Sequence, residues 1–187
     1  MNRAWAILLL AAFNQNRPTT AIESYSSEIH TRSTKTLTSV LRITCLPMKR
    51  FITAADVQHG DFPWCHVEWM SNPETVGAKE LLLVRATFPP GEAHNFHRHP
   101  AREEIIYVTE GRAEQWVGRE KRLLGAGEMA HILKDTPHAT FNPGPGVLKF
   151  LAILSPVNAP GEFTVDVFDE EPWVTLRPPI RYPKAGG

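Results

Sequence analysis

Residues 81–88 read LLLVRATF, and every second position from Leu82 onward is apolar. Successive side chains of a β-strand point to opposite faces, so this pattern predicts a strand with two unlike faces. One face is mixed and consists of Leu81, Leu83, Arg85 and Thr87. The other is wholly apolar and is predicted to face the core; it consists of Leu82, Val84, Ala86 and Phe88.

Short apolar segments of this kind recur along the chain. Glycine, proline, asparagine and aspartate separate them, and these residues favour turns. The predicted strands are 104–108, 112–117, 121–124, 128–133, 138–142 and 147–154, with a hairpin turn at Gly118-Arg119. No long segment has helical periodicity, so the pattern predicts an all-β sandwich or barrel.

The segments on either side of these strands have weaker patterns. Residues 62–69 are a polar, aromatic lead-in, and the NPET sequence at 72–75 predicts a turn. Residues 163–168 predict an edge strand or a dimer contact, so a homodimer is a candidate assembly. Residues 177–187 contain three prolines and are predicted to be irregular.

Length and charge narrow the classes of protein. The 187 residues suit one domain with appendages, and 20 basic residues balance 20 acidic ones. Zero formal charge gives no electrostatic case for binding nucleic acid or an anionic membrane surface. Two cysteines make no disulfide framework, so the redox compartment stays open. Cys65 is predicted to be a small buried apolar residue.

Residues 1–47 are an N-terminal extension, and their sequence has two interpretations. Arg3 precedes an apolar run at 4–13 that is too short to span a bilayer but is typical of a signal peptide, with a cleavage site at Thr19-x-Ala21. Such a protein would be exported. Alternatively the natural chain starts near Met48 and is cytoplasmic. The Ser/Thr-rich stretch 22–47 is predicted to be a poorly structured linker.

Candidate chemistry begins between residues 91 and 111. His97 and His99 are two positions apart, which places both imidazoles on one face of an extended strand. Glu104 opens the apolar run 105–108, which predicts the next strand. Two imidazoles and one carboxylate directed at one point can hold a divalent metal ion.

This stretch resembles the first cupin motif, G-x5-H-x-H-x3,4-E-x6-G, and its matching residues are Gly91, His97, His99, Glu104 and Gly111. A later stretch resembles the second cupin motif, G-x5-P-x-G-x2-H-x3-N, through Gly127, His138 and Asn142. Leu133 and Asp135 stand where the family has proline and glycine. Those two departures fall in a turn and involve no metal ligand.

The resemblance implies a double-stranded β-helix, a jelly-roll barrel. It implies one domain over residues 48–187, with the barrel core at 81–156. Closure of that barrel would bring together the family's four metal ligands, at His97, His99, Glu104 and His138. Nitrogen and oxygen donors of this kind suit one divalent transition metal; we favour Fe or Mn, with Ni, Cu and Zn as alternatives.

Several functions accompany this fold, because fold alone does not select an activity. The first hypothesis is a mononuclear-metal enzyme that acts on a small oxygenated molecule, by dioxygenase-like or related Lewis-acid chemistry. Glu104 is its candidate catalytic residue, as an anionic ligand and as a base. The alternatives are a non-catalytic metal- or ligand-binding cupin and a sugar isomerase or epimerase of the cupin type.

Alternation also predicts the neighbours of the site. Ile106 and Val108 share the face of Glu104, and Thr140 and Asn142 share that of His138. Two further histidines, His94 and His131, are interpreted as surface or satisfied core residues. The alternative for both is a supporting or ligand-contacting role.

Overall fold

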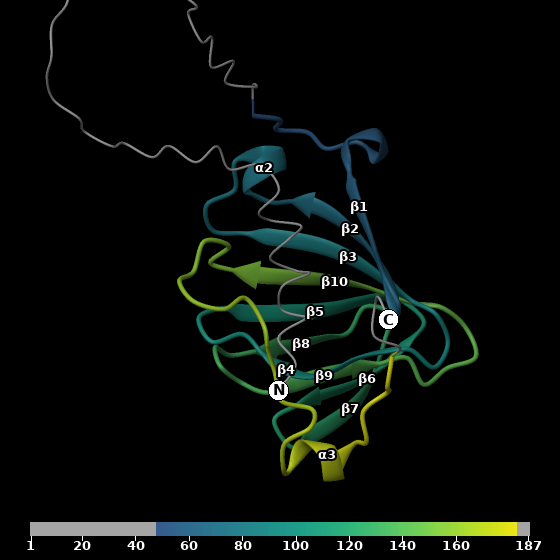
Figure 1. Cartoon of the computed structure of the whole chain (residues 1–187). Coiled ribbons are helices and arrows are strands. Elements are labelled where there is room, and N and C mark those ends of the chain that lie inside the picture. The colour runs from purple at the N-terminus through teal and green to yellow at the C-terminus, as the bar shows by residue number, and fades with distance from the viewer. Residues whose placement is uncertain (1–47, 183–187) are drawn as a thin grey trace, which may run out of the picture.

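The computed structural model describes residues 48–182. They form two antiparallel sheets that make up a jelly-roll barrel, as predicted (Figure 1). The larger sheet has the strand order β1-β2-β3-β10-β5-β8, and the smaller has the order β11-β4-β9-β6-β7. The predictions for residues 1–47 and 183–187 lie outside the described residues.

The strands and short helices have the following bounds: η1 Ala54–Asp56, β1 Gln58–Phe62, β2 Cys65–Ser71, α2 Pro73–Val76, β3 Leu82–Phe88, β4 Ala93–Arg98, β5 Glu103–Glu110, β6 Arg112–Val117, β7 Glu120–Gly125, β8 Met129–Ile132, β9 His138–Phe141, β10 Leu148–Ser155, β11 Val165–Asp166 and α3 Trp173–Leu176. The predicted strands from 81 to 154 all exist, with ends that differ by one or two residues. The hairpin turn at Gly118-Arg119 is also confirmed, since Val117 pairs with Glu120.

The first part of the domain is more regular than its sequence pattern indicated. Residues 58–71 form the β1–β2 hairpin, which extends the larger sheet beyond β3. The predicted turn at 72–75 is the start of α2, a single helical turn. The Asn72 side chain accepts a hydrogen bond from the Thr75 backbone N–H (2.7 Å), which caps that turn.

The main core lies between the two sheets. The apolar face predicted for residues 82–88 is buried in it, with Leu82 and Phe88 each 1% exposed. β10 lies between β3 and β5, and its buried positions alternate, so the strand is not buried throughout. Cys65 is buried as predicted, and burial raises the pKa of its thiol.

A second apolar cluster lies on the outer face of the smaller sheet. Its buried members are Ala93, Phe96, Trp116, Ala139, Phe141 and Val167. The segment after β10 covers them, because Trp173, Leu176 and Ile180 pack against this cluster. Figure 1 shows this segment, with α3, beyond the strands of the smaller sheet. Within it, β11 is the edge strand predicted for residues 163–168, and it pairs with β4.

Residues 177–182 contain no helix or strand, as predicted, yet hydrogen bonds fix them to β4. The Asn95 amide donates to the Ile180 carbonyl (2.8 Å) and accepts from the Ile180 N–H (3.0 Å). The Tyr182 hydroxyl donates to the Ala93 carbonyl (3.1 Å) and accepts from the Ala93 N–H (3.0 Å). β4 is thereby held from the outer side of its sheet.

In residues 48–182 we find no helix that is long and apolar enough to cross a membrane.

Candidate metal centre

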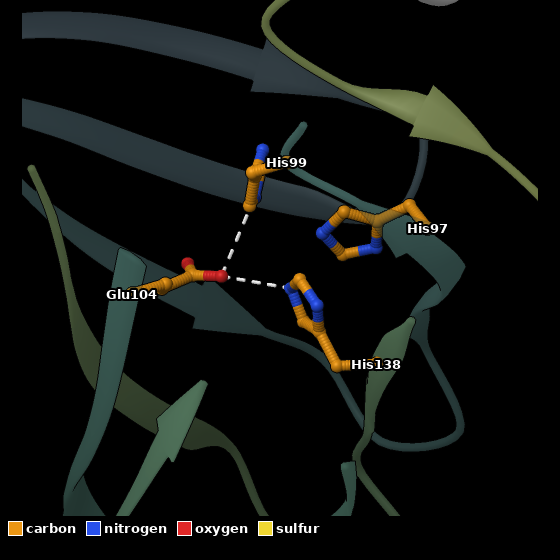
Figure 2. A group of neighbouring side chains, drawn as sticks. All are labelled: His97, His99, Glu104 and His138. Atoms are coloured by element: carbon orange, nitrogen blue, oxygen red, sulfur yellow. Dashed lines mark ion pairs between the residues drawn. The ribbon is translucent and has the colours of Figure 1, made fainter. Parts of the chain in front are cut away.

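Four side chains that the sequence singled out meet inside the barrel. His97 lies on β4, His99 directly follows that strand, Glu104 lies on β5 and His138 begins β9. One donor atom from each lies within 4.8 Å of the others (Figure 2). All four residues are at most 5% exposed. We call these residues the inner quartet; the smaller sheet contributes its histidines and the larger sheet contributes Glu104.

Each imidazole of the inner quartet is oriented by a backbone carbonyl. Nδ1 of His97 lies 2.8 Å from the Asn95 oxygen, Nδ1 of His99 lies 2.6 Å from the Phe163 oxygen, and Nδ1 of His138 lies 2.9 Å from the Thr136 oxygen. A carbonyl can only accept, so Nδ1 is the protonated nitrogen in all three rings. The lone pair of each neutral ring is then on Nε2.

The remaining polar atoms of the site are poorly satisfied. Oε2 of Glu104 lies 2.8 Å from Nε2 of His138 and 3.3 Å from Nε2 of His99. Figure 2 marks both pairs as dashed lines. The 2.8 Å contact lacks hydrogen-bond geometry, and both of its atoms are buried without a hydrogen-bond partner among the described residues. A cation bound by both atoms would satisfy them.

Electrostatics favour the same conclusion. Burial raises the pKa of the Glu104 carboxyl, but the adjacent His138 and His99 outweigh it and hold the pKa well below its usual range. Burial also lowers the pKa of His97, with the neighbouring histidines adding to that effect. The site therefore presents a neutral His97 ring and the Glu104 carboxylate at neutral pH, and its nitrogen and oxygen donors fit a first-row divalent metal ion.

A cavity opens beside the inner quartet, and aromatic and aliphatic side chains dominate its wall. Apart from the quartet, its lining residues are Phe62, Trp64, Val67, Trp69, Leu82, Val84, Ala86, Phe88, His94, Ile106, Thr140, Phe150, Ala152, Leu154, Phe163 and Thr164. Few of them are polar. Such a wall excludes water and suits the apolar part of a small molecule.

His94 belongs to this cavity wall and not to the surface. Its ring stacks on Trp64 (centroids 4.5 Å apart) and on His97 (3.6 Å). Strict alternation places His94 out of phase with His97, but β4 contains a β-bulge: His94 pairs with Thr140 and His97 with His138. Between these two pairs β4 advances by three residues and β9 by two. The extra residue turns the His94 side chain to the inner face of the sheet.

Burial, followed by His138 and His99, lowers the pKa of His94 to about 3. The ring is neutral at physiological pH. His94 is therefore a polar, uncharged group next to a candidate metal ligand. This position is compatible with the supporting or ligand-contacting role that was the alternative for this residue.

The other predicted neighbours divide into two groups. Ile106 and Thr140 line the cavity as expected. Val108 is fully buried in the core, and Asn142 anchors a loop, because its amide donates to three backbone carbonyls, of Phe88, Pro89 and Gly146. His131 is a surface residue, with its side chain 48% exposed beside Glu103.

Arg102 supports the site from a position that no sequence pattern singles out. It is buried, and its guanidinium donates to the carbonyls of Val157 (3.3 Å), Ala159 (3.1 Å) and Glu162 (3.4 Å). It also lies 4.4 Å from the centre of the Phe163 ring. Arg102 thus holds the segment whose Phe163 carbonyl orients His99. These partners are 55–61 residues away in the chain, so no local pattern reveals them.

Comparison with known sequences yields one family and several relatives. The family profile described as "Cupin domain" matches residues 84–154. The chain is 36% identical over 85 residues to the polyketide synthase CurC of Streptomyces cyaneus, covering 46% of this chain and 55% of that protein. It is 35% identical over 85 residues to an uncharacterized protein of Methanocaldococcus jannaschii, covering 46% of this chain and 68% of that protein. The match thus spans about half the length of the first relative.

Solved structures with a similar fold include the polyketide cyclase RemF of Streptomyces resistomycificus. The TM-score is 0.55 at 23% identity, and the match covers 70% of this chain and 95% of that one. The oxalate decarboxylase of Lactobacillus farciminis has a TM-score of 0.57 at 21% identity, over 71% of this chain and 39% of that one. Identities this low show a common fold, and they do not identify the activity.

Proposed function

Because this chain belongs to the cupin superfamily, we propose that it is a mononuclear-metal enzyme that acts on a small oxygenated molecule. The proposed ligands are His97, His99, Glu104 and His138. Fe or Mn is the favoured metal, with Ni, Cu and Zn as alternatives.

One observation carries the proposal. Three backbone carbonyls bind the Nδ1–H groups of the histidines, so three Nε2 lone pairs and a buried carboxylate converge on one point. Hydrogen bonds from Nδ1–H to a backbone carbonyl fix the tautomer and direction of metal-binding histidines. An arrangement that served only to fill a core would have no need to bury Glu104 without a full set of hydrogen bonds.

A bound divalent metal would supply Lewis acidity, polarising a coordinated substrate oxygen and lowering the pKa of its hydroxyl group. Four protein donors leave room for about two more ligands in a six-coordinate site, as catalytic sites require. A substrate with two adjacent oxygens could occupy both places. Hydroxyketones, catechol-like compounds and hydroxy acids meet that requirement.

Glu104 is the proposed catalytic residue. Its carboxylate is anionic at neutral pH and lies at the site, and we propose that it takes up a proton from a substrate hydroxyl whose own pKa a bound metal would lower. The Thr140 hydroxyl donates to Gln115 (2.7 Å), which leaves its oxygen directed as an acceptor for a substrate. His94 offers a second neutral polar group in the cavity wall.

The cavity also favours a substrate with an apolar body. Trp64, Phe88 and Phe150 are among the aromatic residues that line it, and few polar groups compete for contact. This lining suits a ring compound better than a small dianion such as oxalate. Among the relatives, the polyketide synthase and the polyketide cyclase are the ones whose names indicate larger carbon skeletons.

The isomerase or epimerase alternative is less well supported. Such a cupin would use a histidine and a tyrosine as its acid and base, but no tyrosine lines the cavity within residues 48–182. Tyr107 is partly exposed, and the Tyr182 hydroxyl is engaged with the backbone of Ala93. The non-catalytic alternative shares the same metal site, so activity measurements must separate it from the enzyme.

The test is reconstitution of metal-free protein, made without a His tag, with Fe, Mn, Ni, Cu and Zn in turn. Each form is assayed by oxygen uptake and product analysis against chelating substrates, in matched pairs with and without an aromatic ring. We expect turnover with one or two metals and a preference for the aromatic member. If every metal form binds these ligands and converts none, the chain is a binding protein.

A further inference from the structure

A second group of metal-binding side chains lies on the outer face of the β1–β2 hairpin. The register places His59 opposite Glu68 and Asp61 opposite His66. Directly opposed side chains on one face of an antiparallel pair are neighbours. One donor atom from each of His59, His66 and Glu68 lies within 4.8 Å of the others. We call His59, Asp61, His66 and Glu68 the hairpin cluster.

Asp61 sets the tautomer of His66. Its Oδ1 lies 2.7 Å from Nδ1 of His66, and a carboxylate only accepts, so Nδ1 carries the proton. Nε2 of His66 then carries the lone pair, and Nδ1 of His59 lies 3.2 Å from it. A carboxylate that binds one nitrogen of an imidazole and leaves the lone pair on the other is the usual support of a metal-binding histidine, and a metal ion would replace the contact between the two rings.

Glu68 adds the negative charge. Arg85 on β3 binds it with two N–H groups, one of which donates from Nη2 to Oε1 (2.6 Å). This contact holds the pKa of Glu68 below its usual value, so the side chain is a carboxylate at neutral pH. A carboxylate has about four acceptor positions, and Arg85 uses two of them. The rest can bind a cation.

We propose that the hairpin cluster binds a divalent ion of the zinc class, with His59, His66 and Glu68 as ligands and Asp61 orienting His66. Two nitrogens, one oxygen and a water molecule make a tetrahedral set that Zn²⁺ accepts and Mg²⁺ does not favour. The exposed position of His59 gives the ion direct access from solvent.

The bound ion would link the edge of the larger sheet to the strand beside it. Among residues 48–182, β1 pairs with β2 alone, so a cross-link between these two strands would restrain it. The opposite face of the same hairpin carries Val67 and Trp69, and its turn carries Trp64, all in the cavity wall. Zn²⁺ on the outside therefore steadies one wall of the cavity on the inside.

The decisive experiment is calorimetric titration of Zn²⁺ into the full chain without a His tag. Wild type is expected to bind two ions per chain. His59→Ala/His66→Ala and His97→Ala/His99→Ala are each expected to bind one, and the fourfold variant none at comparable affinity. The matched control is His131→Ala, which removes an equally exposed histidine outside the cluster and should leave both ions in place.

Uptake of Zn²⁺ that is the same in wild type and His59→Ala/His66→Ala would disprove the site. This result does not depend on the inner quartet, because both proteins keep it intact. Conversely, loss of the inner ion alone would refute the proposed function and leave the hairpin site standing. Mg²⁺ at the same concentrations should give no heat that depends on His59 or His66.

A second variant tests the ligand role of Glu68. Arg85→Gln removes a positive charge beside the site and frees the carboxylate, so Zn²⁺ should bind about fivefold more tightly. Hydrogen exchange of the β1 amides in His97→Ala/His99→Ala, with and without Zn²⁺, reports the cross-link directly. We expect slower exchange with the ion; unchanged exchange would refute the link between the strands.

Discussion

The inner quartet and the hairpin cluster use the same kinds of donor but hold them differently. In the inner quartet, backbone carbonyls from three separate segments bind the imidazoles, and the donors come from both sheets. In the hairpin cluster, side chains of one hairpin bind each other, and Asp61 is 86% exposed. Donor type alone does not distinguish a deep metal site from a surface one.

The difference lies in what each group would lose if no ion were present. In the hairpin cluster, His59 and Asp61 are exposed and His66 and Glu68 are partly exposed, so these side chains can exchange hydrogen bonds with water at little cost. The inner quartet cannot, because Glu104 and His138 leave buried atoms without a hydrogen-bond partner in the described part of the chain. Preorganisation and burial should therefore make the inner quartet the tighter and more specific site.

The largest expected effect is on metal content. His97→Ala/His99→Ala removes two of the four proposed ligands and should lower the affinity of the inner site by at least about 100-fold, since even losing a supporting contact costs about 10–100-fold. Elemental analysis of protein purified without a His tag measures it. His59→Ala/His66→Ala is the matched control. The control should keep its metal through purification as wild type does; loss of that metal from both variants alike would remove the distinction between the two regions.

Glu104→Gln is expected to separate catalysis from metal binding. The amide keeps the size of the side chain but loses the charge and the ability to accept a proton. Metal affinity should fall, and turnover at equal metal loading should drop by about 100-fold, as expected for loss of a general base. Steady-state kinetics on metal-quantified samples test it. Turnover that follows metal loading alone would leave Glu104 as a ligand only.

Arg102→Met tests whether the segment at 157–163 matters to the site. The variant leaves three backbone carbonyls, of which that of Val157 is buried, without their donor, so we expect unfolding to become easier by about 2–3 kcal/mol. Metal affinity should fall about tenfold, because the Phe163 carbonyl no longer orients His99 firmly. Denaturant unfolding and metal titration measure the two effects. Arg102→Lys should restore part of both.

Arg122→Ala is the matched control for Arg102. Arg122 forms an exposed pair with Glu120, which should contribute less than about 1 kcal/mol. A decrease in metal affinity in this variant as large as in Arg102→Met would indicate a general loss of stability and no specific role for Arg102.

Low pH should decrease the stability of the metal-free protein through His94, which borders the inner quartet. Its pKa is about 3 in the folded chain, whereas a histidine in the unfolded chain titrates near 6.5. Between these values the unfolded chain binds a proton that the folded chain does not. The stability of the metal-free protein should therefore decrease as pH falls below about 6.5, by up to about 1.4 kcal/mol per pH unit for this group.

His94→Phe keeps an aromatic ring against Trp64 but cannot bind a proton. We expect a smaller decrease in stability between pH 6.5 and pH 5 in this variant, measured by denaturant midpoints. His97 contributes in the same direction, so part of the slope should persist. Glu104 titrates at lower pH and stays outside this window. Identical slopes in variant and wild type would place His94 in contact with water.

The smallest effect is expected at the hairpin cluster itself. Without added metal, His59→Ala should change the free energy of unfolding by less than about 0.5 kcal/mol, because it removes only an exposed contact to His66. Thermal or denaturant unfolding in the presence of a chelator measures this. A larger loss would show that the cluster stabilises the fold without an ion and would reduce its contrast with the inner quartet.

Much of the fold could be predicted because alternation is a local property. The pattern of residues 82–88 identified both the strand and its buried face, and the turn at Gly118-Arg119 was visible in the same way. The spacing of His97, His99 and Glu104 indicated a possible metal site, and the resemblance to the cupin family added His138 to complete the inner quartet. Its arrangement in space required barrel closure, which the resemblance to a family implied and the pattern alone did not.

Alternation did not predict side-chain positions where an extra residue shifts the alternation of a strand, or where segments that are distant in the sequence meet. The bulge in β4 has no sequence signal, so alternation could not decide between a surface or core position for His94 and the place beside the site that it occupies. Asn142 follows the end of β9, where alternation no longer applies. The hairpin cluster did have a signal: His59 and Asp61, and then His66 and Glu68, are two residues apart on neighbouring strands.

The contacts that hold β4 from behind have a consequence for the order of events during synthesis. Ala93 and Asn95 are bound by Tyr182 and Ile180, which the ribosome adds 85–89 residues later. Until residues 180–182 emerge from the ribosome, the packing of Ile180 against the outer face of the smaller sheet is absent. The hydrogen bonds that Ile180 and Tyr182 form with β4, the strand that carries His97, are absent too. A nascent chain can pair its early strands as they appear. Secure capture of a metal ion must wait for the far end of the domain.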